Sequence, residues 1–172
     1  MAATVTGRFR ANVQFSHTPD SGFYSGVARE QLKIFDAAFA AGTAAGKVDL
    51  VFPIRLDLVA STPQSLNLQS LVDPNGATIT GLARVRVIVL WNEVTTDAAF
   101  TTVAPNGTNG WDSWITGTGA RLRGSTSSLS SLLIGVAPDT TGFVVDATHR
   151  MLDFTPSAHA QTIKGLIAGC SL

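Results

Sequence analysis

The sequence predicts an all-β chain folded as a single-domain β-sandwich. Apolar and polar residues alternate with a period of two over many short stretches, which is typical of strands with one buried face. Turn residues interrupt these stretches at intervals of about ten residues, the spacing of sandwiches and barrels. The 172 residues suit one domain with its own core, and no linker or solenoid repeat divides them.

The N-terminal region begins with a predicted strand. Over residues 5–15, Phe9, Val13 and Phe15 alternate with polar side chains, and the turn formers of 17–22 end the pattern. We expect one domain over residues 1–172. Within it, the strand and loop of residues 1–30 either pack on the sandwich or extend from it as an arm.

Residues 27–41 fit two interpretations. Leu32, Phe35 and Phe39 have the spacing of one helical face, among good helix formers. Leu32 and Ile34 also alternate with polar neighbours, as in a strand. We favour the strand because the segment lies in a β-rich succession, and we keep the helix as the alternative.

The strand of residues 84–91 is expected to form the centre of the core. Its buried face is assigned to Val85, Val87 and Val89. Arg86 is assigned to the opposite face. Since that face also becomes apolar at Ile88, the strand is expected to enter a region covered on both sides.

The remaining elements are shorter. Strands are predicted at residues 54–58, 66–69, 131–136, 142–147, 151–154 and 163–168. Turns are predicted at 42–47 and at the Asp-Pro-Asn-Gly sequence of 73–76. Residues 95–126 are rich in Gly, Thr, Asn and Ala and have weak periodicity, so we expect a long irregular loop excursion there.

The composition excludes several functional classes. Twelve Lys and Arg balance 12 Asp and Glu, so the net charge is zero, and only 14% of the residues are charged. A nucleic-acid-binding protein needs a basic surface, so binding to nucleic acid is not expected for this chain. A surface with so little charge is expected to be partly covered by partners. The single Cys170 excludes an internal disulfide, and neither a signal-peptide pattern nor a membrane-spanning apolar run is present.

Motifs of catalytic and metal sites fail on spacing. Residues 42–47 place three residues between glycines where a phosphate loop needs four, and Val48 stands where Ser or Thr is required. A calcium loop beginning at residue 73 would have Thr78 and Arg84 at its sixth and twelfth positions, in place of Gly and Glu. We therefore expect no catalytic residue, no cofactor and no metal ion.

Isolated polar residues do not form a recognisable site. Three histidines occur in predicted loops: His17, His149 and His159. Without a nearby His or Cys partner they are expected at the surface or an interface rather than on zinc. Asp49 and Asp57 are not expected to converge in one cleft. Cys170, at the end of an apolar strand, is expected to be buried and unreactive.

Trp111 and Trp114 admit a functional interpretation. They lie in the predicted excursion, where exposed aromatic side chains would stack on sugars. They suit the core or a subunit contact as well, because Trp is enriched at interface centres. We favour core or interface, and keep a carbohydrate- or receptor-binding module as the alternative.

The order of seven segments carries a resemblance. They are AGTAAGKVDLVF (41–52), ASTPQSLNL (60–68), LVDPNGATI (71–79), ARVRVIVLWN (83–92), APDTTGFVV (137–145), LDF (152–154) and IKGLIAGCS (163–171). As an ordered set they resemble a family of small bacteriophage virion structural proteins. Two positions depart from it: Asn67 stands where Asp is more usual, and Cys170 where Thr or a similar small residue is common.

This resemblance implies a jelly-roll-like β-sandwich in a phage virion, with no catalytic chemistry. We expect a capsid decoration or cement protein, made in the host cytoplasm. Such a protein stabilises the shell by binding its own copies, as a homotrimer, and the major capsid protein or other virion proteins. A head–tail or tail-associated protein is the alternative within the resemblance. Neither a membrane nor a nucleic acid is an expected partner.

Overall fold

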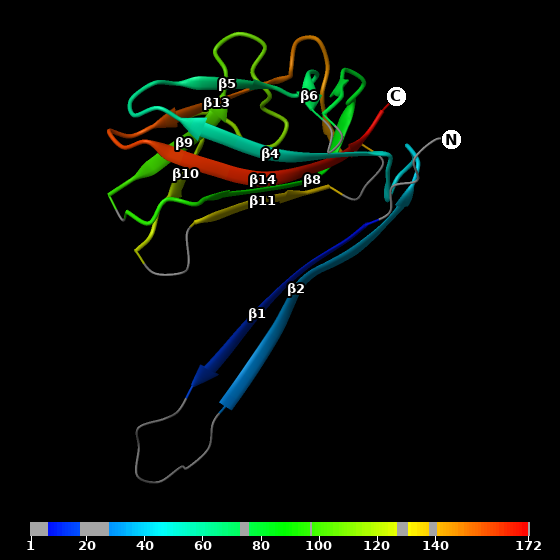
Figure 1. The fold of residues 1–172 in the computed structure, drawn as a ribbon. Coiled ribbons are helices and arrows are strands. Elements are labelled where there is room, and N and C mark those ends of the chain that lie inside the picture. Colours follow the sequence, from blue (N-terminus) through cyan, green and yellow to red (C-terminus); the bar gives the residue numbers. More distant parts are fainter. Residues whose placement is uncertain are drawn as a thin grey trace.

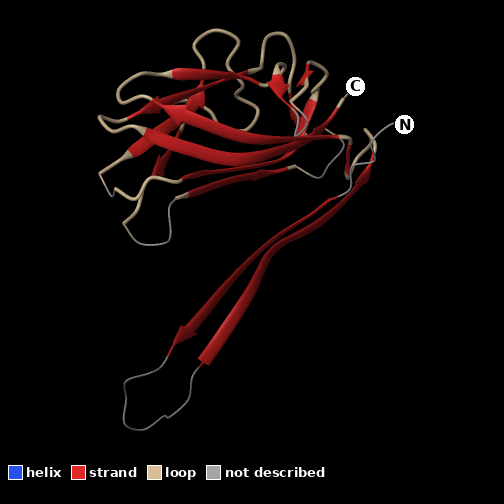
Figure 2. Ribbon diagram, viewed as in Figure 1, coloured by secondary structure: helices blue, strands red, loops and turns tan. Residues whose placement is uncertain are grey.

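The computed structural model describes residues 7–17, 28–72, 76–96, 98–126, 131–137 and 141–171. All regular secondary structure in these ranges is β-strand, with no helix, so the predicted all-β class is confirmed (Figure 2). The strands are β1 (Gly7–His17), β2 (Ala28–Ala41), β3 (Lys47–Val48), β4 (Leu50–Leu58), β5 (Gln64–Asn67), β6 (Leu71–Val72), β7 (Thr78–Ile79), β8 (Arg84–Asn92), β9 (Phe100–Pro105), β10 (Ala120–Arg123), β11 (Leu132–Val136), β12 (Phe143–Val144), β13 (Met151–Pro156) and β14 (Gln161–Cys170).

Two antiparallel sheets form the body of the molecule (Figure 1). One has the order β11–β8–β14–β4, with β12 paired to β8; the other has the order β10–β9–β13–β5. In β4 the apolar residues alternate as predicted, so Phe52 and Leu56 are buried while Arg55 is exposed. The inner faces of both sheets share one core, which includes Ile163 and Phe154. The body is therefore a β-sandwich.

Residues 27–41 form a strand rather than a helix. β2 pairs with β1 from Ala28 to Phe39, with a register shift between Ala11 and Asn12. The predicted turn that follows is also confirmed: residues 42–46 form bends and a turn, with positive φ at Gly42 and Gly46, and β3 then pairs with the end of β2 in parallel. Residues 73–75 of the other predicted turn, and 18–22 of the first loop, lie outside the described residues.

Residues 106–119 form the expected irregular loop, but the excursion predicted for residues 95–126 is otherwise wrong. This segment contains β9 and β10, half of the second sheet. In β9 the buried positions are Thr101 and Val103, so one of only two inward residues is polar. The alternation is therefore too short and too polar to be recognised without its pairing to β13.

The predicted faces of β8 are wrong for most of the strand. Ala168 of β14 pairs with Val87, but the next residue, Gly169, pairs with Val85, so Arg86 is an extra residue in a β-bulge. A bulge of one residue reverses the alternation. Val85 and Ile88 therefore both belong to the sandwich core, whereas Val87 belongs to a second cluster on the outer face of the sheet.

Arg86 is fully buried rather than set on an open face. The notion that this part of β8 is covered on both sides is supported, because Val87 and Ile88 are both buried.

A buried polar cluster links the two sheets at one end. Gln161 of β14 accepts hydrogen bonds through Oε1 from Asn92 Nδ2 (2.6 Å) and Thr101 Oγ1 (2.9 Å), and its Nε2 donates to the carbonyl of Phe100 (2.7 Å). Asn92 lies on the same sheet as Gln161, and Thr101 on the other. The cluster thus fixes the sheets relative to one another with its polar groups satisfied.

Replacing Gln161 by Leu should lower the free energy of unfolding by about 2–4 kcal/mol. The change leaves Asn92 Nδ2 and Thr101 Oγ1 buried without their shared acceptor, and each such group costs about 1–3 kcal/mol. Urea denaturation measures the loss. Adding Thr101→Val to Gln161→Leu should cost less than the two single changes summed, because both remove one hydrogen bond; strict additivity would contradict this arrangement.

Candidate assembly interface

The β1–β2 hairpin extends away from the sandwich. Figure 1 shows it leaving the body beside β4 and diverging from the outer face of the five-stranded sheet toward its tip. Within the described residues, β1 pairs only with β2, and the only other strand paired with β2 is the short β3, at Ala40 and Ala41. An isolated two-stranded ribbon is marginally stable in water at best. Beyond its root, the described part of the hairpin therefore has no strand of the body paired beside it.

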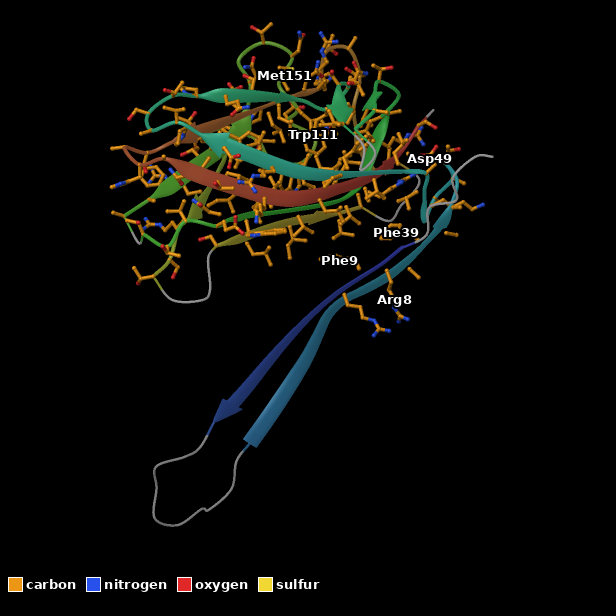
Figure 3. All side chains as sticks on the ribbon, in the orientation of Figure 1. Arg8, Phe9, Phe39, Asp49, Trp111 and Met151 are labelled. Atoms are coloured by element: carbon orange, nitrogen blue, oxygen red, sulfur yellow. The ribbon has the colours of Figure 1, made fainter. Side chains whose placement is uncertain are left out.

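The root of the hairpin covers one end of the outer face. Phe9 and Phe39 lie where the hairpin meets the sheet (Figure 3). With Val48 they pack over a row of residues that runs across four paired strands: Val51, Ala168, Val87 and Val136. Phe39 and Val87 are only 5% and 4% exposed, so this end of the face is closed.

The next two rows of the same face remain open; the second row is apolar, and the third is half apolar and half charged. The register places Pro53, Leu166, Val89 and Ile134 side by side in the second row, and Arg55, Lys164, Trp91 and Leu132 in the third. Leu132 is 56% exposed and Leu166 39%. We call their apolar members the exposed patch: Pro53, Val89, Trp91, Leu132, Ile134 and Leu166.

Charged residues adjoin the exposed patch: Arg55 and Lys164 lie in the third row beside Trp91 and Leu132, and their partners Asp57 and Glu93 lie farther from the hairpin root. Arg55 Nε donates to Asp57 (3.1 Å), which also accepts a hydrogen bond from Thr162 Oγ1 (2.8 Å). These two hydrogen bonds, the one from Arg55 first, hold the pKa of the Asp57 carboxyl below its ordinary value. Lys164 pairs with Glu93 nearby. An apolar centre with a charged rim is the anatomy of a protein–protein interface.

Trp111 and Trp114 belong to the core, which agrees with the favoured interpretation of the sequence, core or interface. Trp111 is fully buried, and its indole Nε1 donates to the Val144 carbonyl at 2.6 Å. The two indole rings lie 5.9 Å apart, and Trp114 packs against the core so closely over Gly135 that a Cβ there would overlap it. An exposed sugar platform built on this pair is therefore contradicted.

The other candidate residues are scattered rather than brought together. Asp49 accepts hydrogen bonds from the Ser171 backbone and hydroxyl beside the C-terminus, whereas Asp57 lies at the far end of β4. Cys170 is buried, as expected. His159 is exposed in a loop, and His17 is the last residue of β1 rather than a loop residue. Among the described residues, no three His, Cys, Asp or Glu side chains gather closely enough to hold a metal ion.

His149 takes part in a turn with Asp146. The Asp146 carboxylate accepts hydrogen bonds from the backbone N–H groups of Thr148 (2.7 Å) and His149 (2.8 Å) and from the Thr148 hydroxyl. These bonds, the Thr148 hydroxyl first, hold the pKa of Asp146 far below its ordinary value. The pair is half-exposed and closes a loop, which is a structural role.

Acid should open the Asp146 turn only well below the ordinary titration range of an aspartate. Because its folded-state pKa is depressed, the carboxylate stabilises the fold above about pH 4 and loses that contribution as pH falls through the folded value. NMR titration of the side-chain carboxyl should give a midpoint below that of Asp in a peptide. In Asp146→Asn, stability should fall less between pH 7 and pH 2 than in the unchanged chain; an equal fall would contradict this role.

Comparisons of the chain with protein-family models, with curated proteins and with solved structures returned no match. Among the described residues, no helix is long and apolar enough to cross a membrane.

Proposed function

We propose that this chain is a structural subunit of a bacteriophage particle, without enzymatic activity, that works by binding copies of itself and neighbouring virion proteins. One observation carries the assembly role: a hairpin leaves the body while the adjacent sheet face stays apolar and open. Monomeric proteins rarely expose a large contiguous apolar area, and they usually protect the edges of their strands. The zero net charge and the low fraction of charged residues support the same conclusion.

The strand order supports a jelly-roll sandwich. Eight body strands pair in a nested way, the first with the last: β4 with β14, β5 with β13, β8 with β11, and β9 with β10. That nesting is a long hairpin folded over on itself, as in the jelly rolls of viral capsid and lectin domains. Fold alone does not identify function. It agrees, however, with the sequence resemblance to phage virion proteins.

Within the particle, a capsid decoration or cement protein is the favoured role, in contact with the major capsid protein. Such a protein needs a stable body and docking surfaces and no reactive centre. A head–tail or tail-associated position is the alternative from the same resemblance. The carbohydrate-binding alternative loses its main support, because Trp111 is fully buried.

The direct test is to add the purified chain to empty shells of the phage that encodes it and to count bound copies by mass spectrometry. Saturable binding at a fixed number of copies per shell is expected, with higher resistance of the decorated shells to heat. Absence from purified particles and no binding to shells would overturn the virion assignment. Copies found only at the connector or tail would replace decoration with the head–tail alternative.

A further inference from the structure

We propose that the exposed patch is the binding site for the β1–β2 hairpin of a second copy of this chain, so that copies are joined by exchanged arms. This inference rests on the assembly role proposed above and specifies how it is achieved. The arm is defined as the hairpin beyond its root, residues 11–35.

The exposed patch continues a contact that the chain already makes. The hairpin root buries the first row of the outer face with Phe9 and Phe39, and the exposed patch is the next two rows of that face. The arm continues the root along the same two strands. Its sequence keeps the alternation begun at Phe9, with Ala11, Val13 and Phe15 separated by Asn12 and Gln14. The same kind of ribbon therefore suits the open rows of the face.

The chain's own arm is directed away from the exposed patch. At the root, Ala40 N–H donates to the Gly46 carbonyl (3.2 Å) and Gly42 N–H donates to the Val48 carbonyl (3.0 Å), which ties the end of β2 to the turn and to β3. Phe39 and Val48 are buried in the same cluster. These contacts fix the exit direction, and Figure 1 shows the hairpin diverging from the sheet beyond them. A second copy is thus the occupant that the geometry favours over the chain itself.

The dimensions also suit an exchange between copies. The part of β1 that belongs to the arm, residues 11–17, has seven residues and a length of about 23 Å at 3.3 Å per residue. This is enough for the arm to cross the four strands of a neighbouring face, which are about 4.8 Å apart. Each copy offers one arm and one patch, a head-to-tail contact that forms a ring when the rotation between copies closes. A ring of three agrees with the trimer expected from the sequence.

Two variants separate the arm from the patch. In the armless variant, residues 11–35 are replaced by Asn-Gly; Arg10 and Asp36 are directly paired, so a two-residue turn closes the shortened hairpin and keeps the root. In the patch variant, Leu132 and Leu166, both partly exposed, become Glu. Val72→Glu is the matched control, because Val72 is 50% exposed but lies in β6, outside the outer face.

Native mass spectrometry at micromolar concentration gives the readout. The full chain and Val72→Glu should be oligomeric, and the armless and patch variants monomeric. Mixed together, these two should form a 1:1 heterodimer and nothing larger, because only one arm and one patch remain between them. Circular dichroism should show both variants folded.

The other outcomes overturn the inference in distinguishable ways. An armless variant that still self-associates would mean that patches bind one another or that copies meet elsewhere, and the assembly role would survive. Monomeric variants that fail to form the heterodimer would exclude the exchange of arms. A full chain that stays monomeric, with no binding to shells, would overturn the proposed function itself.

Discussion

Replacing Ile88 by Asp should abolish folding of the sandwich, whereas the same replacement at the neighbouring Val87 should leave it folded. Ile88 is fully buried in the sandwich core opposite Ile167. An unpaired carboxylate there costs several kcal/mol, against about 5–15 kcal/mol for the stability of a whole domain. We expect Ile88→Asp to be insoluble or to lack a cooperative unfolding transition.

Val87→Asp tests the outer face. Val87 is covered by the hairpin root together with Val48, so a carboxylate at this position regains water when the root moves away. The loss should be limited to the burial of Val87 and its contacts, about 1.5–3 kcal/mol. Trypsin should then cut the released root faster at Arg8 and Arg10. Thermal unfolding and the rate of cleavage are the two measurements.

The two substitutions together decide which side of β8 faces the core. The two substitutions lie at adjacent positions and introduce the same carboxylate. A difference between their losses of stability therefore reports the position and not the chemistry of the new residue. The opposite result, in which Val87→Asp unfolds the chain and Ile88→Asp is tolerated, would mean that the bulge at Arg86 is absent. A shift of one residue exchanges the two faces of the strand.

Replacing Trp111 by Ala should lower the free energy of unfolding by about 3–5 kcal/mol, the range for truncation of a large buried aromatic side chain. The indole is fully buried, meets Phe143 edge to face with ring centroids 6.1 Å apart, and packs beside Trp114. Its removal leaves a large cavity between the loops and the sheet. Urea denaturation gives the change directly.

Trp111→Phe is the matched control for the hydrogen bond. Phe keeps much of the apolar volume but cannot donate to the Val144 carbonyl, so we expect a smaller loss of about 1–3 kcal/mol. Ser113 Oγ also donates to that carbonyl (3.2 Å), which places the expected value toward the low end. A Trp111→Ala chain as stable as the unchanged one would show that the indole is not part of the core.

The sequence by itself determined the class of the fold and the elements whose pattern is local. In β4, inward Phe52, Ile54 and Leu56 alternate with outward Arg55 and Asp57, so the strand and its buried face were both predictable. The turn after Ala41 was predictable for the same reason, because glycines at positions 42 and 46 permit the positive φ angles found there. The mismatches to the phosphate-loop and calcium-loop motifs were likewise visible in the sequence, because both motifs are defined by the spacing and type of their residues.

Pairing between distant segments decided the rest of the fold. The faces of β8 depend on a bulge that exists only because Gly169 of β14 pairs with Val85, and no pattern within residues 84–92 reveals it. Thr101 is buried because Gln161 supplies its hydrogen-bond partner from another sheet, so β9 looks too polar for a strand when read alone. Residues 28–41 fit a helix or a strand until β1 provides a ladder for them.

The candidate interface shows the same division. A low fraction of charged residues indicated that part of the surface is covered, since few charges remain to keep it hydrated. The charge fraction did not indicate where the covered surface lies. The exposed patch takes its residues from β4, β8, β11 and β14, and each of these strands is apolar on both faces for part of its length. Which of the two faces lies inward is set by how the sheets stack. The outward direction of the hairpin is set in turn by the packing of Phe9 and Phe39 against strands distant in the sequence.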